Sequence, residues 1–418
     1  MKEAHELDSA APSERPWIYG LLIAPSAVVA NGVIQGGALS YMLRQQGVGI
    51  GRTASVVTLL ALPTSLYFLW SPITDFFVRR RTWLLIGAVL SAMLMTVALS
   101  EHDLASHRAI TLILISACCS QLVVSSCGGM MGALRRERSK RVAGSFYQGG
   151  SLGFGQASVS LLIPLYGLGK HGLLGLAAGS MIVLPALFAL AAPPQDEVPS
   201  AGFGEAMERL KSEFAATFLR WRALPYTLMM LFPMCSGSAV SLLPGIAQDY
   251  GVSPDQIAWM NGMVGALLTA AGSLAASLLP ARARASVTYL SLGLVNAATL
   301  CVLWLGPLRP WVYLSGATLY LFTVGACYAL FTAVVLEFLG RSGKSGSSRY
   351  SIINSLGNVP VLYMIKLEGM GGSRWGPRGV PATEAVLSAV GGGALLVYFL
   401  LKKRNETVDE ELADIEAA

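Results

Sequence analysis

The sequence predicts an all-α integral membrane protein with twelve transmembrane helices. Hydrophobic residues make up 54% of the 418 residues, charged residues make up only 13%, and the charges are nearly absent from long stretches of the chain. The charged share is about half of the roughly 25% that is usual for soluble domains. This composition argues against an ordinary soluble enzyme and against a disordered or nucleic-acid-binding chain.

Twelve apolar stretches hold 277 residues, but only five charged side chains: Asp75, Glu337, Lys366, Glu368 and Glu384. A helix needs about 20 apolar residues to cross the hydrocarbon core, and each stretch is close to that length or longer. Backbone groups in lipid must bond internally, so these stretches are expected to be helices. A transmembrane barrel would show alternation over about ten residues, which is not found. The stretches are 17–43, 53–75, 83–100, 109–134, 144–168, 172–192, 224–248, 256–279, 286–306, 311–339, 351–370 and 384–401.

The basic residues predict the orientation. With the N-terminus in the cytoplasm, the inner segments carry 22 of the 30 Lys and Arg residues, and the outer segments carry seven. This bias is typical of multi-pass proteins whose basic loops lie in the cytoplasm. We therefore expect both termini to be cytoplasmic and the protein to lie in the inner (cytoplasmic) membrane. The net charge of +6 then reflects loops that face anionic lipid heads.

The chain divides into two halves of six stretches. The pattern Phe-x4-Ser-Leu-Gly at Phe146 recurs as Tyr-x4-Ser-Leu-Gly at Tyr350, and Pro25 and Pro233 are similarly placed in the first and seventh stretches. Such offsets favour duplicated bundles. Proline within a membrane helix also permits a kink. The predicted parts are a tail at 1–16, a bundle at 17–192, a linker with an amphipathic helix at 193–223, a second bundle at 224–401, and a tail at 402–418.

The exit from the second stretch reads LWSPITDFFVRRRTWLL over residues 69–85. This string resembles the loop between helices two and three of the major facilitator superfamily, where a small residue precedes an acid and a basic cluster. Together with Tyr147-Gln148-x-Gly150 and Ser348-Arg349-Tyr350, it is similar to the branch that holds muropeptide permeases (AmpG-like) and acetyl-coenzyme A transporters, with siderophore permeases nearby.

The resemblance implies two pseudo-symmetric six-helix bundles around a central cavity. It also implies a secondary active or facilitative transporter that works by alternating access. Two departures change the expected solute chemistry. Tyr67 stands where relatives carry a lysine, and the fourth stretch is neutral from Ser120 to Cys127, where relatives carry acids. The cavity is therefore expected to be polar but neutral, which suits an amphiphilic or zwitterionic solute of muropeptide-like, siderophore-like or related type.

Uncharged polar and aromatic side chains are the candidate solute-binding residues. The alternative is that each one merely bonds helix to helix, as polar groups in membrane bundles often do. The candidates are Asn31, Gln35, Trp70, Gln121, Ser125, Tyr147, Gln148, Tyr328, Asn354 and Asn358.

A second candidate set lies at the inner gate. The resemblance places Asp75 against the start of helix eleven, where the helix dipole favours a negative charge by roughly 0.3–1 kcal/mol. The alternative is an interfacial acid in water. Asp75 and Glu337 are also the candidates for proton coupling, although Glu337 has the alternative of an exposed pair with Arg341; Glu368 and Glu384 come next. The gating set is Asp75, Arg79, Arg80, Arg81 and Arg349.

Two other functions fit the sequence less well than transport. A membrane-embedded enzyme needs a clustered nucleophile, base or metal set. The apolar stretches contain no histidine, and no paired carboxylates are expected in them. A transporter-like receptor or sensor would carry a sizeable soluble output domain, whereas the linker has only about 31 residues. Export of drugs or metabolites by a protein of the same fold is an alternative function that the sequence does not exclude. The expected partners are a small solute, the lipid bilayer and protons as the candidate coupling ion. No nucleic acid, metal or other cofactor is expected, and the chain is expected to be monomeric.

Overall fold

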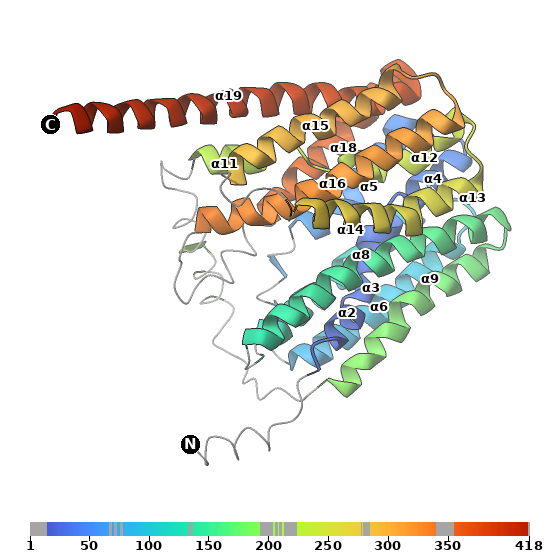
Figure 1. Ribbon diagram of the computed structural model, residues 1–418. Coiled ribbons are helices and arrows are strands. Elements are labelled where there is room, and N and C mark those ends of the chain that lie inside the picture. Colours follow the sequence, from blue (N-terminus) through green and yellow to red (C-terminus); the bar gives the residue numbers. More distant parts are fainter. Residues whose placement is uncertain are drawn as a thin grey trace, which may run out of the picture.

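The helices form two groups that meet at one end of the molecule (Figure 1). The computed structural model describes residues 15–416 except for gaps at 67–68, 71–72, 76–77, 133, 135–136, 277, 279–284 and 340–354, and it describes only residues 204, 208, 211 and 212 within 193–223. The predicted amphipathic helix of the linker lies within 193–223 and is therefore mainly outside the described residues.

The first group of helices spans residues 18–191. α6 packs against α7 and α9, and α8 packs against α2, α3 and the π-helix η1. The bounds are α2 Ile18–Leu22, α3 Ala24–Ala27, η1 Val28–Ile34, α4 Ala38–Gln45, α5 Ile50–Ser65, η3 Ile73–Asp75, α6 Arg80–Ser100, α7 His107–Gly132, α8 Glu137–Gly167, α9 His171–Ala186 and η4 Leu187–Ala191.

The second group of helices repeats this packing. α15 packs against α16 and α19, α14 packs against α16, and α18 packs against α19. The bounds are α11 Leu224–Leu231, η6 Ser238–Ser241, α12 Leu243–Ala247, η7 Gln248–Tyr250, α13 Pro254–Trp259, η8 Met260–Val264, α14 Gly265–Ala276, α15 Ala285–Leu305, α16 Pro310–Leu339, α18 Val359–Trp375, η9 Gly376–Arg378 and α19 Gly379–Glu416.

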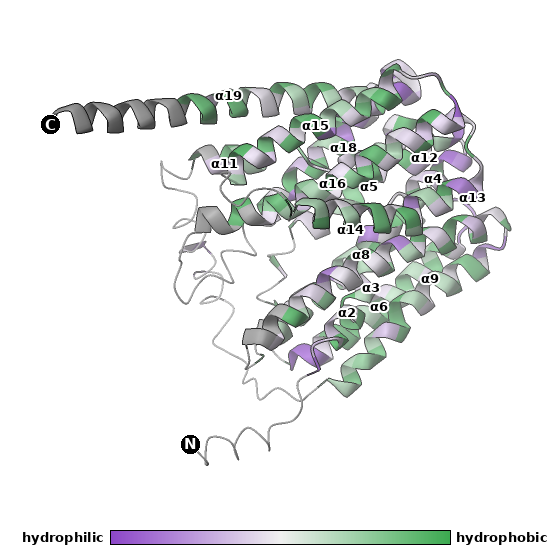
Figure 2. Ribbon diagram, in the orientation of Figure 1, coloured by the Kyte–Doolittle hydropathy of each residue, from purple (hydrophilic) through white to green (hydrophobic). Residues whose placement is uncertain are grey.

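These helices confirm the predicted all-α membrane fold. Eight described stretches are long and apolar enough to cross a membrane, and one of them, 355–401, contains α18 and the first part of α19. The remaining three spans are α5, which has 16 residues, α8, which is rich in Gly and Ser, and the interrupted pair α11–α12. Hydrophobic residues predominate along most of the described helices (Figure 2). Large apolar side chains are exposed on them, such as Leu274, which is 71% exposed, and Val390, which is 68% exposed. Exposed apolar surface of this extent is typical of contact with lipid.

Three predicted stretches are not continuous α-helices. The first span passes through a seven-residue π-helix and a left-handed residue, Gly37. The seventh span stops at Leu231 and resumes as a 3₁₀ turn at Ser238. The eighth span has a π-helix around Gly262, whose φ/ψ of −100° and −112° is not helical. The first interruption follows Pro25, and the second contains Pro233; proline removes a backbone donor and weakens the helical ladder.

Glycine allows the two groups of helices to approach at the end away from the termini. A Cβ at Gly37 would overlap the ring of Pro244, and its φ of 86° is costly for any residue with a side chain. A Cβ at Gly369 of α18 would overlap the side chain of Ala54 on α5. The first and seventh spans, and the second and eleventh, therefore pack backbone to backbone.

Gly272 of α14 gives a direct test of this packing. A Cβ there would overlap the backbone oxygen of Phe322 on α16. Gly272→Ala should therefore destabilise the protein by about 1–3 kcal/mol, as overpacking does, and lower its melting temperature in detergent. Gly393→Ala is the matched control, because no atom lies within 4 Å of its added Cβ. Equal melting temperatures for the two variants would contradict the described α14–α16 contact.

Candidate functional site

The seventh span is broken in the middle of the helix bundle. Between α11 and η6 the backbone is not helical, and both Cys235 (φ 54°) and Gly237 (φ 67°) are left-handed. A break frees carbonyl groups, and each free group costs several kcal/mol in hydrocarbon unless it is bonded. Side chains of three other helices bond them. The donors are Tyr363 to the Leu231 oxygen at 2.6 Å, Ser388 to the Pro233 oxygen at 2.6 Å, and Tyr289 to the Met234 oxygen at 3.3 Å.

Glu384 of α19 lies against this break and is fully buried. The Tyr320 hydroxyl of α16 donates to both of its carboxylate oxygens, at 2.9 and 2.8 Å. The backbone N–H of Ala239 donates to Oε2 at 3.1 Å, and the Ser236 hydroxyl donates to Oε1 at 3.3 Å. Three hydrogen-bond donors to one carboxylate offset much of the cost of removing its charge from water.

Glu368 of α18 is the second buried carboxyl group at the break. It is also fully buried, and its Oε1 accepts a hydrogen bond from the Ser238 hydroxyl. Its Oε2 has no hydrogen-bond partner among the described residues. The two carboxyl groups interact with each other, and neither forms an ion pair in the described part of the chain. This pair is the most unusual polar cluster in the described structure.

Sequence reasoning ranked Glu368 and Glu384 below Asp75 and Glu337, and it did not pair them. The signal was nevertheless present, because both residues flank the short turn η9 between two antiparallel helices. Glu368 stands eight residues before this turn, and Glu384 stands six residues after it. Similar distances from a tight turn place two side chains at similar depth in the membrane.

Two of the predicted solute-binding residues, Gln121 and Ser125, lie one helical turn apart on α7. The Gln121 amide nitrogen donates to Thr64 of α5 at 3.3 Å, but its Oε1 is buried without a partner among the described residues. The Ser125 hydroxyl is also buried without a described partner. Polar atoms at i and i+4 share one helix face. These two therefore leave unused hydrogen-bonding capacity on one face.

The other predicted solute-binding residues differ in exposure and in hydrogen bonding. Asn31 donates to the Ser151 hydroxyl of α8 at 2.9 Å, so its side chain bonds one helix to another. Tyr328 is 42% exposed, and its hydroxyl lies beside Gly237 at the break in the seventh span. Gln148 is exposed on α8, whereas Gln35, Trp70, Tyr147 and Asn358 are half-buried. Asn354 lies outside the described residues.

The predicted inner gate is only partly described. The backbone of Asp75 forms the end of η3, and Glu337 lies in α16, but the side chains of both are outside the described part, as is all of Arg349. Arg81 donates to the Leu190 oxygen at 2.8 Å. The Arg80 guanidinium lies over Gly129 of α7, and Arg79 is exposed at the start of α6. These three arginines lie at or just before the start of α6. Their gating role stays a prediction.

The opposite end of the molecule carries polar contacts between the two bundles. Arg44 of α4 pairs with Asp249 of η7 at 3.1 Å and also donates to the Gly245 oxygen at 3.2 Å. Beside it, Gln45 donates to Gln248 at 2.9 Å. Burial raises the pKa of the neighbouring Tyr250 to about 12, so its hydroxyl stays protonated and donates to the Leu303 oxygen. Sequence analysis did not predict this closure.

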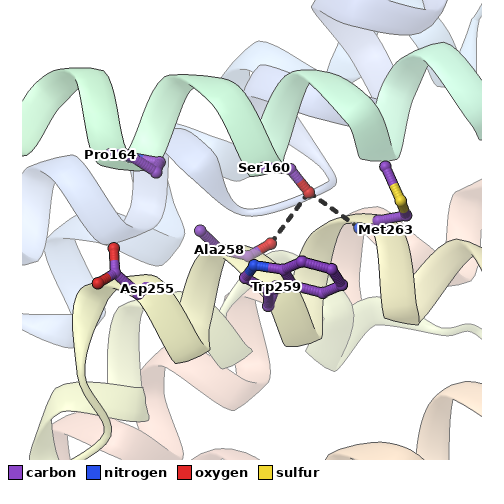
Figure 3. Close-up of a pocket in the computed structure, with 6 residues that line it drawn as sticks. All are labelled: Ser160, Pro164, Asp255, Ala258, Trp259 and Met263. Carbon is purple, nitrogen blue, oxygen red and sulfur yellow. Dashed lines mark hydrogen bonds between the residues drawn. The ribbon is translucent and has the colours of Figure 1, made fainter.

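Ser160 of α8 joins the bundles at a second place (Figure 3). Its hydroxyl donates to the Ala258 oxygen at 3.1 Å and accepts from the Met263 N–H at 2.9 Å, so it bridges the irregular turn of the eighth span. A side chain inserted into the helical ladder is a known cause of kinks. The recess beside it, of about 260 Å³, is lined by Pro164, Asp255 and Trp259 and contains none of the predicted binding residues.

This architecture, with two helical bundles, broken first and seventh spans and contacts that close one end, is that of a membrane transporter. The chain matches the model of the Major Facilitator Superfamily over residues 21–362 and belongs to that superfamily. The comparison with curated protein sequences returns no match.

Solved structures agree with this assignment of the fold. A D-xylose-proton symporter superposes with a TM-score of 0.67 at 12% identity, over 91% of this chain and 95% of that one. A POT family transporter in complex with a thioalcohol-conjugated peptide gives a TM-score of 0.69 at 12% identity, over 92% and 95%. A point mutant of the nucleoside transporter NupG gives 0.67 at 12% identity, over 92% and 99%. Identities this low indicate a common fold only.

Asp249→Asn should loosen the closed end. The side chains of Arg44 and Asp249 are 17% and 28% exposed, so the pair is partly shielded from water and should contribute about 1 kcal/mol. Its loss should raise the population of molecules open at this end several-fold. Spin labels at Arg52→Cys and Arg309→Cys, which are exposed positions on the two bundles, would report longer distances.

Glu101→Gln is the control for this experiment. It removes an ion pair with Arg108 that lies within one bundle and is more exposed. Its distance distribution should match that of the wild type. An unchanged distribution in Asp249→Asn would show that the Arg44–Asp249 pair does not hold the bundles together.

Proposed function

We propose that this protein carries a small amphiphilic or zwitterionic solute across the cytoplasmic membrane by alternating access. Muropeptide-like, siderophore-like and related metabolites are the candidate solutes. The observation that carries the proposal is the closure between the bundles at one end, through Arg44 and Asp249, while the described helices of the two bundles diverge toward the other end (Figure 1). A carrier caught with one side closed has this arrangement.

The solute site is proposed to include the neutral face of α7. Gln121 and Ser125 have buried polar atoms without partners in the described part of the chain. Such atoms are costly unless a ligand or water bonds them. Tyr328, beside the break in the seventh span, would add an aromatic surface from the opposite bundle. The hydrogen-bonding groups of Gln121 and Ser125 are uncharged, and Tyr328 is aromatic. Such a site suits an uncharged or zwitterionic solute better than a strongly charged one.

Tyr328→Ala and Gln121→Ala should both weaken solute binding. Each change removes a hydrogen-bonding or stacking partner, at a cost of about 1–3 kcal/mol, which corresponds to a roughly 5- to 150-fold weaker Kd. Binding is measured by calorimetry on purified protein with a muropeptide and with a ferric siderophore. Tyr398→Ala is the control, because this tyrosine of α19 is exposed and is not among the predicted solute-binding residues. Unchanged Kd values in both cavity variants would place the solute elsewhere.

The closed end is proposed to be the outer end. This follows from the predicted cytoplasmic location of both termini, because basic residues concentrate on that side. Single cysteines at His5 and at Arg374, in a variant lacking the six native cysteines, should react with an impermeant reagent from opposite sides of the membrane. Labelling of both positions from one side would contradict the twelve-span topology.

A further inference from the structure

Glu368 and Glu384 come from the two helices of one hairpin and meet at the break in the seventh span. Both side chains are 0% exposed. Hydroxyl groups of Ser236, Ser238 and Tyr320 surround them. Two carboxyl groups at close range in a dry site cannot both carry a negative charge without a large cost. Such a site needs a positive partner or a bound proton.

Among the described residues, no positive partner lies at the pair. The titratable groups that face the pair are Tyr320 and Tyr328 from α16 and Cys235 from the seventh span, and all three are neutral acids. Lys366, on the same helix as Glu368, is exposed and donates instead to the Ser55 hydroxyl of α5 at 2.5 Å. In the described part of the chain, neither carboxylate has a salt bridge. A proton is therefore the simplest means of neutralising one charge.

The hydrogen bonds identify the carboxyl group that carries this proton. Glu384 accepts hydrogen bonds from three donor groups besides Glu368, so it is well solvated as an anion. Glu368 receives one, from Ser238, and its Oε2 has no described partner. A hydrogen on Oε2 would turn this unpaired acceptor into a donor, and Glu384 is the neighbouring acceptor.

We propose that Glu368 and Glu384 form the proton-binding site that couples this transporter to a proton gradient, an inference that rests on the proposed function above. When the outer end opens, a hydronium ion in the external water transfers its proton to Glu368 Oε2. One O–H bond of the hydronium ion breaks, and an O–H bond forms on Oε2, whose hydrogen is shared with Glu384. When the inner side opens to the site, this O–H bond breaks and a cytoplasmic water molecule takes up the proton as hydronium. The carboxyl groups undergo no other covalent change.

The position of the pair connects it to the contacts that close the outer end. Gly369, next to Glu368, packs on Ala54 of α5 in the opposite bundle. Ser238 begins η6, which leads into α12 and then to Asp249, the partner of Arg44. A change of charge at Glu368 therefore acts on two of the elements through which the second bundle contacts the first, α18 and α12.

A sodium ion fits the cluster less well. Sodium would need several free oxygen ligands, but Tyr363, Ser388 and Tyr289 already bond three of the carbonyl oxygens at the break. The Ala239 N–H points at Glu384, and a backbone donor repels a cation. The site is thus built to hold a carboxylate and one proton.

Infrared spectroscopy of the full-length protein in lipid vesicles tests the site without a solute. The C=O stretch of a protonated carboxyl group is followed across a pH titration. Wild-type protein should show a band that persists to a pH at which exposed carboxyl groups are ionised, and Glu368→Gln should lack it. Glu208→Gln, at an exposed position, is the matched control and should keep it. The same band in Glu368→Gln would overturn the proposal.

Two further variants keep the test decisive if Glu368→Gln does not fold. Glu384→Gln and Tyr320→Phe each change the environment of the shared proton. Each should move the midpoint of the infrared titration by about one pH unit or more, because coupled groups interact on that scale. Unmoved midpoints in both would overturn the proposal. So would a band that responds to sodium replacing N-methylglucamine at constant pH, because that would indicate a cation site.

A transport assay shows separately whether the proton site and the proposed solute class are correct. Uptake of a muropeptide and of a ferric siderophore into proteoliposomes is measured with and without an imposed pH gradient. The gradient should drive accumulation in wild type and Glu208→Gln, but not in Glu368→Gln. Uptake that the gradient drives equally in all three would overturn the coupling role. The infrared band without uptake of either solute would instead support the proton site and count against the proposed solute class.

Discussion

The structure depends on one constraint: a broken helix in a membrane must have its backbone groups bonded by the protein itself. Pro233 cannot continue the helical ladder, and the backbone stays irregular until Ser238. In hydrocarbon, no water would bond the freed carbonyl oxygens. Tyr289, Tyr363 and Ser388 bond them from α15, α18 and α19. The break therefore fixes the positions of three other helices around it.

The same break creates the polar site. An unbroken helix would present no free N–H in its middle, whereas here Ala239 donates to Glu384. Ser236 and Ser238, in and just after the irregular segment, supply hydroxyl donors to the two carboxyl groups. Discontinuous helices in transporters place backbone dipoles at buried binding sites. The broken span thus provides the hydrogen-bond donors that stabilise the two buried acids.

Two kinds of contact hold the bundles together: close packing at glycine residues, which depends on shape, and an ion pair, which depends on charge. Glycine contacts such as Gly37 with Pro244 depend on shape alone, so they tolerate sliding but not added volume. The Arg44–Asp249 pair depends on charge and on limited exposure to water. Weak polar contacts over close backbone packing permit a bundle interface to open without unfolding either bundle. This combination suits a protein that alternates between two states.

The sequence by itself determined the fold class, because apolar stretches of membrane length leave the backbone no alternative to helices. It also predicted that the helices can kink at Pro25 and Pro233 and that the fourth span contains no charged side chain. Only the tertiary structure decided which polar residues meet. Gln121 and Ser125 keep unpaired atoms, whereas Asn31 bonds another helix. Glu368 and Glu384 each appeared as isolated acids near helix ends. Their meeting depends on the rotation of α18 and α19 about their axes and on the irregular backbone beside them, and hydrophobic periodicity is weak in helices that contact both lipid and protein.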